Sequence, residues 1–154
     1  MAVGTGRAQG AATAKSVYHL SFPRDRTRPV MHRSDLPAAA ALFDQMADAA
    51  YLIDPATSAI VWGNRAAWAM LGLTREDVLD QSVLSLQIDV TGMPQWSEIA
   101  AAIRAQDCFT FVGRHRHADG HEIHVEVNTT HFTLGGREYF LSVARDVRRR
   151  MALE

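Results

Sequence analysis

The fold is decided by CFTFVGRHRHADGHEIHVEVNT, the stretch from Cys108 to Thr129. Apolar and polar residues alternate in both halves, which is typical of strands that bury one face. The linker Ala118-Asp119-Gly120 allows a two-residue turn or a three-residue loop with a left-handed glycine. The two-residue turn would put phenylalanines of the first half on the same face as polar side chains of the second. We therefore predict a β-hairpin with the three-residue loop, which pairs His117 with His121.

This register also predicts the outer face of the hairpin. Arg116 lies opposite Glu122 and Arg114 lies diagonal to Glu126, and opposite charges at such positions stabilise a sheet modestly. The next apolar run, residues 138–144, follows a Gly-Gly turn and is apolar on both faces. We interpret it as a third strand, covered on both sides.

The segments before the hairpin predict four helices and two more strands. Apolar residues at three- and four-residue steps indicate a first helix. Turn-forming residues 54–58 separate two short apolar runs, as in a hairpin. The capping side chains of Asn64 and Thr74, and a proline at position 94, predict three short helices. The predicted bounds are 36–48, 64–71, 74–79 and 94–107 for the helices and 49–53, 59–63, 108–117, 121–129 and 138–144 for the strands.

Composition excludes several classes of protein. The chain has 154 residues, of which 47% are apolar, and this size suits one domain. Its formal net charge of -1 gives it no large basic surface of the kind that binds nucleic acid. Its one cysteine, Cys108, rules out an internal disulfide and a cysteine-rich zinc site. No apolar run is long enough to cross a bilayer, and we find no signal peptide. We therefore expect a cytoplasmic protein.

Charge is unevenly distributed along the chain. Residues 1–33 contain six basic residues and one acidic residue, whereas the remainder contains ten basic and sixteen acidic residues. The first segment has no sustained hydrophobic period, so we predict a flexible basic leader over 1–33. The domain then occupies 34–148. Residues 149–154 are interpreted as the start of a linker or as a tail left by cloning.

Five phrases of the sequence occur together in a characteristic order. They are YLID (51–54), IVWGN (60–64), MLGLTREDVL (70–79), HADGHEI (117–123) and ARDV (144–147). No single phrase is specific, but together, in this order and at these separations, they resemble the PAS sensor-domain family over about residues 35–148.

The resemblance implies an α+β fold, with a five-stranded antiparallel sheet, short helices packed on one face of it and an additional N-terminal helix. It also implies an input module that senses a small molecule in a cavity between sheet and helices. Members of this family commonly form homodimers and signal to an output domain. Here the signal would pass through the N-terminal helix and the C-terminal linker to an enzyme such as a histidine kinase or a diguanylate cyclase.

The resemblance also narrows the cofactor. Photoactive flavin members need a reactive cysteine on the helix that follows the one starting at Asn64. Residues 74–106 contain no cysteine, and Cys108 lies in a predicted strand. Haem-binding members commonly ligate iron through a histidine on the long helix, and residues 94–106 contain none. We therefore expect neither a cysteinyl-flavin nor haem. Non-covalent flavin stays open, although the residues that would offer aromatic surface also serve as ordinary core, namely Trp62, Trp68, Phe109 and Phe111.

Five of the seven histidines fall in or after the hairpin, at 115, 117, 121, 124 and 131. His117 and His121 share a face, but His124 lies on the other face and no acidic residue completes a ligand set, so we predict no metal site. His115 lies on the inner face. Its imidazole either contacts an anionic or polar ligand, with Thr129 and Ser142, or is satisfied by backbone groups.

Two functional classes remain, and neither is an enzyme, because no nucleophile–base pair or carboxylate pair appears and no catalytic residue is expected. The first class is a ligand-sensing module. Its candidate ligand-binding residues are Leu52, Val61, Trp68, Leu71, Ile99, Ile103, Phe109, Phe111, His115, Val125, Val127, Phe140 and Ser142. The second class is a ligand-free dimerisation or docking module. The candidate dimer interface in either case consists of Leu36, Phe43, Met46, Tyr139, Leu141 and Val143.

Overall fold

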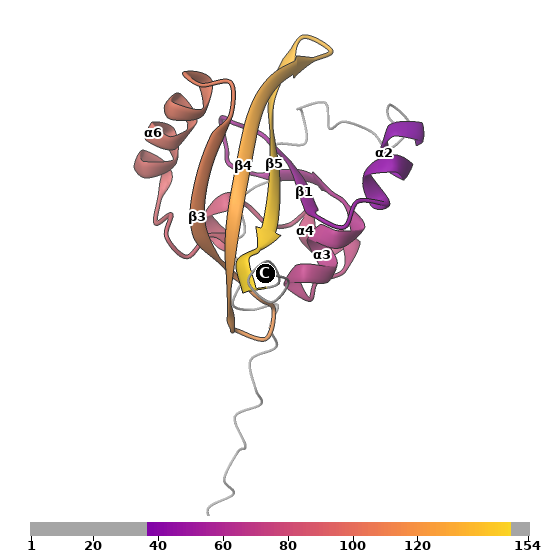
Figure 1. The fold of residues 1–154 in the computed structure, drawn as a ribbon. Helices are drawn as coiled ribbons and strands as arrows, with labels where there is room; N and C mark the ends of the chain where they lie inside the picture. The colour runs from indigo at the N-terminus through magenta and orange to yellow at the C-terminus, as the bar shows by residue number, and fades with distance from the viewer. Residues whose placement is uncertain (1–36, 149–154) are drawn as a thin grey trace, which may run out of the picture.

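The computed structural model describes residues 37–148, which form an antiparallel sheet with helices packed against it (Figure 1). The sheet has five strands in the order β2-β1-β5-β4-β3, so the last strand lies at the centre. This arrangement confirms the predicted fold class. The elements are α2 (Pro37–Asp44), β1 (Ala49–Ile53), β2 (Ile60–Gly63), α3 (Arg65–Leu71), α4 (Arg75–Val78), α5 (Val83–Leu86), α6 (Met93–Arg104), β3 (Phe109–Arg116), β4 (Glu122–Leu134) and β5 (Arg137–Asp146).

The β3–β4 hairpin has the predicted register. His115 pairs with Ile123, and the His117 amide donates to the His121 carbonyl over 2.9 Å. Gly120 adopts the expected left-handed conformation, with φ 98°. On the outer face, the Arg114 guanidinium contacts Glu122, at one of its two diagonal positions. The sequence predicted Glu126, at the other diagonal position, as its partner.

The core fills the space between one sheet face and helices α3 to α6. Its strand residues include Tyr51 and Ile53 of β1 together with Phe140 of β5. Burying this apolar surface provides the main driving force for folding. Both faces of β1 are buried, as the burial of Ala50 and Leu52 on the opposite face shows. None of the described helices is both long and apolar enough to cross a membrane.

The short helices begin where their capping residues predict. The Asn64 side chain accepts from the Ala67 amide at the start of α3, and Gly72 ends that helix with φ 67°. Thr74 and Asp77 form a reciprocal capping box on α4. Helix α6 ends at Arg104, three residues earlier than predicted.

Two parts of the helix prediction are wrong. The structure adds α5, which Ser82 and Ser85 cap reciprocally, so four short helices precede β3. Helix α2 ends at Asp44 instead of continuing to about Asp48. It ends early because the Asn64 side-chain amide donates to the carbonyls of Phe43 and Asp48, which fixes the chain for its entry into β1. The predicted start at Leu36 and the predicted leader lie outside the described residues.

Candidate ligand-binding site

A cavity of about 40 Å³ lies between the inner face of the sheet and helices α5 and α6. This volume accommodates a few water molecules or a comparably small molecule. Strands β1, β3, β4 and β5 form one side of its wall, together with the first residue of β2. The segment that contains α5 and α6 forms the other side. The lining residues are Tyr51, Ile53, Ile60, Val83, Leu86, Gln87, Val90, Trp96, Ile99, Ile103, Phe111, His115, Val127, Thr129 and Ser142.

Polar atoms in this apolar cavity set its chemistry. His115 and Gln87 are each only 5% exposed, and neither His115 Nδ1 nor Gln87 Oε1 has a hydrogen-bond partner among the described residues. The hydroxyls of Thr129 and Ser142 satisfy each other over 2.7 Å. Buried polar atoms normally have partners, so two unpaired ones at a single cavity indicate a place for a molecule that hydrogen-bonds them.

The position of Gln87 depends on a glycine. Gln87 follows α5 and forms an isolated antiparallel bridge with His115 of β3. A Cβ on Gly113 would lie 2.9 Å from Gln87 Oε1, closer than real Cβ atoms approach. A side chain at position 113 would therefore require the Gln87 amide to shift from its place against the strand.

Burial determines the charge of the site. It lowers the pKa of His115 to about 4, because the imidazolium would lose its hydration without gaining a partner. Burial also raises the pKa of Tyr51, whose hydroxyl donates to the Ala67 carbonyl over 3.5 Å. Both groups are thus neutral near pH 7. The neutral imidazole favours a neutral polar ligand over the anion that the sequence left open.

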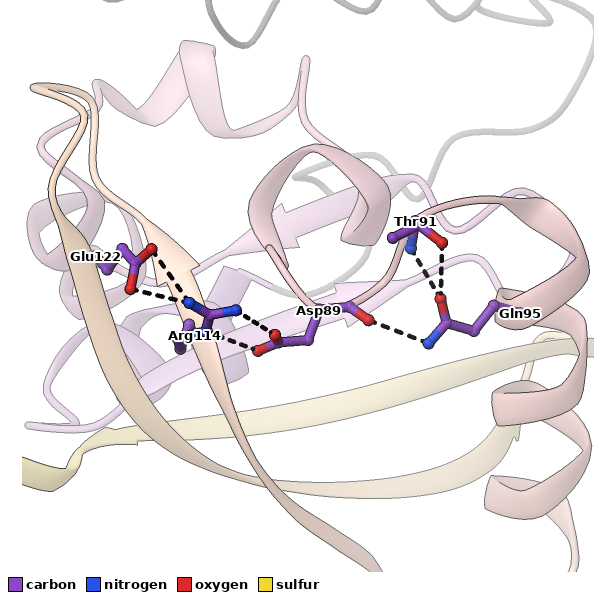
Figure 2. A network of polar contacts seen from close by, with 5 residues as sticks. All are labelled: Asp89, Thr91, Gln95, Arg114 and Glu122. Atoms are coloured by element: carbon purple, nitrogen blue, oxygen red, sulfur yellow. Dashed lines mark hydrogen bonds and ion pairs between the residues drawn. The ribbon is translucent and has the colours of Figure 1, made fainter.

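A polar network on the outside holds one wall of the cavity in place (Figure 2). Arg114 of β3 donates to Asp89 over 2.6 Å and also contacts Glu122 of β4. Gln95 of α6 donates to the Asp89 carbonyl and accepts from the Thr91 amide and hydroxyl. The segment between α5 and α6, which contributes Gln87 and Val90 to the cavity, is thereby attached to the hairpin.

The structure brings six of the thirteen candidate ligand-binding residues together at the cavity. These are Ile99, Ile103, Phe111, His115, Val127 and Ser142. Seven others do not line it. They are Leu52, Val61, Trp68, Leu71, Phe109, Val125 and Phe140.

The reasons for these differences are geometrical. Leu52 lies on the opposite face of the sheet, where it pairs with Leu141 and Trp62. Leu71, Val125 and Phe140 are buried in the core away from the cavity, with no more than 1% of each exposed. Trp62 packs edge-on against Phe43, so the aromatic residues proposed for a flavin are not gathered in one place.

Sequence reasoning missed eight of the lining residues. Tyr51 and Ile53 alternate with Leu52, and choosing the other phase of that strand would have found them. Gln87 carried no signal, since it lies just after the helix that was not predicted. The other missed residues are Ile60, Val83, Leu86, Val90 and Trp96.

The candidate dimer residues lie away from the cavity. Leu36 is outside the described residues. Phe43 contacts Trp62 with ring centroids 5.6 Å apart, and Tyr139 is buried beside Phe132. Met46, Leu141 and Val143 are half-buried.

Comparison with known proteins gives a consistent result. The model of the PAS domain family matches residues 48–149. A PAS domain of an HTR-like protein from Haloarcula marismortui is 25% identical, with 70% of this chain and 88% of that chain covered and a TM-score of 0.64. A PAS domain from Colwellia psychrerythraea is also 25% identical, with 75% and 98% covered and a TM-score of 0.63.

A domain of a sensory box sensor histidine kinase/response regulator from Geobacter sulfurreducens is 21% identical. It covers 77% of this chain and 100% of its own, with a TM-score of 0.59, and it supports the fold alone. No curated protein matches the chain.

Proposed function

The chain belongs to the PAS domain family, and from that premise we propose that it is a signal-input module whose cavity takes up a small, neutral, polar molecule. One observation carries the proposal. His115 Nδ1 and Gln87 Oε1 are buried at the same cavity without partners among the described residues. A molecule that hydrogen-bonds both would remove the cost of burying them, about 1–3 kcal/mol for each unsatisfied group.

The proposed signal leaves the cavity through two neighbouring strands. Ser142 lines the cavity on β5, and it pairs with Tyr51 of β1. β5 continues to Asp146, close to residue 149, where the proposed linker to an output domain begins. At the same end, Arg145 donates to Asp48 over 2.8 Å and so connects β5 to the segment after α2. A change in β5 would therefore reach both the linker and the N-terminal helix.

We also propose that the module acts as a cytoplasmic homodimer and that any catalysis belongs to a histidine kinase or cyclic-dinucleotide output domain. The half-buried residues Met46, Leu141 and Val143 are the candidates for the dimer contact. The polar atoms of the cavity need neither haem nor flavin to satisfy them. An absorption spectrum of the purified protein is expected to lack bands of either group.

A titration with small molecules tests the cavity. Neutral molecules of a few heavy atoms, such as acetamide, urea and short alcohols, are added while methyl NMR signals of Ile99, Ile103 and Val127 are followed. We expect at least one of them to shift these signals with a saturable dependence on concentration. Native mass spectrometry of freshly purified protein reports any molecule that is retained without addition.

Two variants make the titration specific. Gln87→Leu removes one unpaired atom and Val127→Leu fills part of the cavity, and both are expected to abolish the saturable shift. Asn128→Ala, on the outer face of β4 beside Val127, is the matched control and should leave the shift unchanged. A folded wild-type protein that responds to no molecule would instead favour the ligand-free dimerisation or docking module.

A further inference from the structure

The turn of the β3–β4 hairpin gathers two imidazoles and a carboxylate. His117, Asp119 and His121 each offer one ligand atom, and these atoms all lie within 4.8 Å of one another. None of the three lines the cavity. The sequence predicted no metal site because no acidic residue shares a strand face with these histidines. Asp119 reaches them from the turn instead.

The turn conformation directs the three side chains to one point. The His117 and His121 rings stack with centroids 4.4 Å apart and planes 21° from parallel. Their Nδ1 atoms lie 3.0 Å and 2.5 Å from the same oxygen, Asp119 Oδ1. The left-handed Gly120 closes the loop that allows this approach.

His117 Nδ1 lies between two groups of Asp119. The Asp119 backbone N–H donates to this nitrogen over 3.1 Å, and the Asp119 carboxylate oxygen lies 3.0 Å from it. A cation between the nitrogen and the carboxylate oxygen would be attracted by the lone pair of the first and the negative charge of the second.

The atoms fit the geometry of a bound ion after a small movement. Around a tetrahedral ion with bonds of about 2.0–2.1 Å, neighbouring ligand atoms are about 3.3 Å apart. The two nitrogen–oxygen separations, 3.0 Å and 2.5 Å, need to increase by less than about 1 Å to reach that value. The two nitrogens, which lie within 4.8 Å of each other, also have to come to about this separation. The side chains are free to move, because 54% of His121 and 60% of Asp119 is exposed. Binding through His117 Nδ1 would displace the Asp119 backbone N–H from it.

We propose that His117, Asp119 and His121 bind a divalent transition metal ion, with Zn²⁺ the first to test. Two imidazoles and one carboxylate are a ligand set that suits Zn²⁺, Cu²⁺ and Ni²⁺, and three protein ligands leave a coordination position open. The ion would fix the turn against helix α3. The Ala118 amide already donates to the Leu71 carbonyl over 2.8 Å, and the His117 ring occupies the space beside Gly72.

Competition with a chromophoric chelator on untagged protein tests this site. We expect one Zn²⁺ per chain, with an affinity that falls at least about tenfold in His121→Ala and in Asp119→Asn. His124→Ala is the matched control, because this exposed histidine of β4 points to the other face, and it should bind as the wild type does. Equal affinity in wild type and His121→Ala would overturn the proposal, as would an equal loss in His124→Ala.

A second measurement separates coordination from any effect on folding. Substoichiometric Cu²⁺ broadens NMR signals of nearby residues, and we expect this broadening to be confined to residues 117–121 and the end of α3. Far-UV circular dichroism should be unchanged in all three variants. Broadening centred on another histidine would contradict the assignment, whatever the total affinity for metal.

Discussion

Replacing Asn64 with alanine should destabilise the domain more than the loss of a single helix cap. Asn64 is completely buried, and its side chain makes four hydrogen bonds of 2.9–3.0 Å. The carboxamide oxygen accepts from Ala50 and Ala67, and the nitrogen donates to Phe43 and Asp48. The residue therefore joins β1, the start of α3 and the segment after α2.

The magnitude follows from the partners left behind. The Ala67 amide retains the Asn64 backbone carbonyl as an acceptor over 3.0 Å, and the Phe43 carbonyl retains the Met46 amide as a donor over 3.2 Å. Two groups, the Ala50 amide and the Asp48 carbonyl, therefore lose their partner. At about 1 kcal/mol for each of these two hydrogen bonds, Asn64→Ala should lower the free energy of unfolding by roughly 2 kcal/mol. The loss would be larger if the buried Ala50 amide stays unsatisfied.

Urea unfolding followed by tryptophan fluorescence measures this loss. Thr74→Ala is the matched control, because Thr74 accepts one capping bond at an exposed helix start and should cost about 1 kcal/mol. An Asn64→Ala variant that loses no more than Thr74→Ala would refute the reasoning, since it would mean that the connections to Phe43, Asp48 and Ala50 contribute nothing.

Three further predictions concern the turn, the outer network and the buried histidine. Gly72→Ala should destabilise the domain by at least about 1 kcal/mol in urea unfolding, since φ is 67° and the new Cβ would lie 2.4 Å from the His117 ring. Arg114→Met should change the free energy of unfolding little, because the ion pairs it removes are exposed. It should speed amide hydrogen exchange around Asp89, because that segment loses its attachment to β3; unchanged exchange would contradict this. Lowering the pH from about 6.5 to 4 should cost up to roughly 3 kcal/mol through His115, because its pKa falls to about 4 in the folded protein and the unfolded chain binds the proton first. His115→Leu should remove this part of the pH dependence, and an identical pH dependence in the variant would count against the buried neutral imidazole.

Local sequence patterns predicted the parts of the fold that local chemistry controls. The hairpin register followed from the alternation around Phe111 and Val125 and from the glycine at position 120. The starts of α3 and α4 followed from the capping side chains of Asn64 and Thr74. In each case a residue within a few positions supplies the hydrogen bond or the backbone conformation that fixes the element.

Tertiary packing controlled what the sequence did not predict. Helix α5 is an exception, because its start is fixed locally by two serines that cap each other, a signal that the sequence analysis did not use. β1 is buried on both faces, so its composition could not indicate that Tyr51 faces the cavity and Leu52 faces away. Gln87 lies beside Gly113 and forms a bridge with His115, and both residues are far from it in the sequence.

A crystal structure of the protein as purified, at a resolution that shows ordered waters, tests the central claim most directly. The claim is that His115 Nδ1 and Gln87 Oε1 together bind a small neutral molecule in the cavity. We predict non-protein density larger than a water molecule, within hydrogen-bonding distance of both atoms. A cavity that holds only water, or side chains that turn to satisfy each other, would contradict the claim.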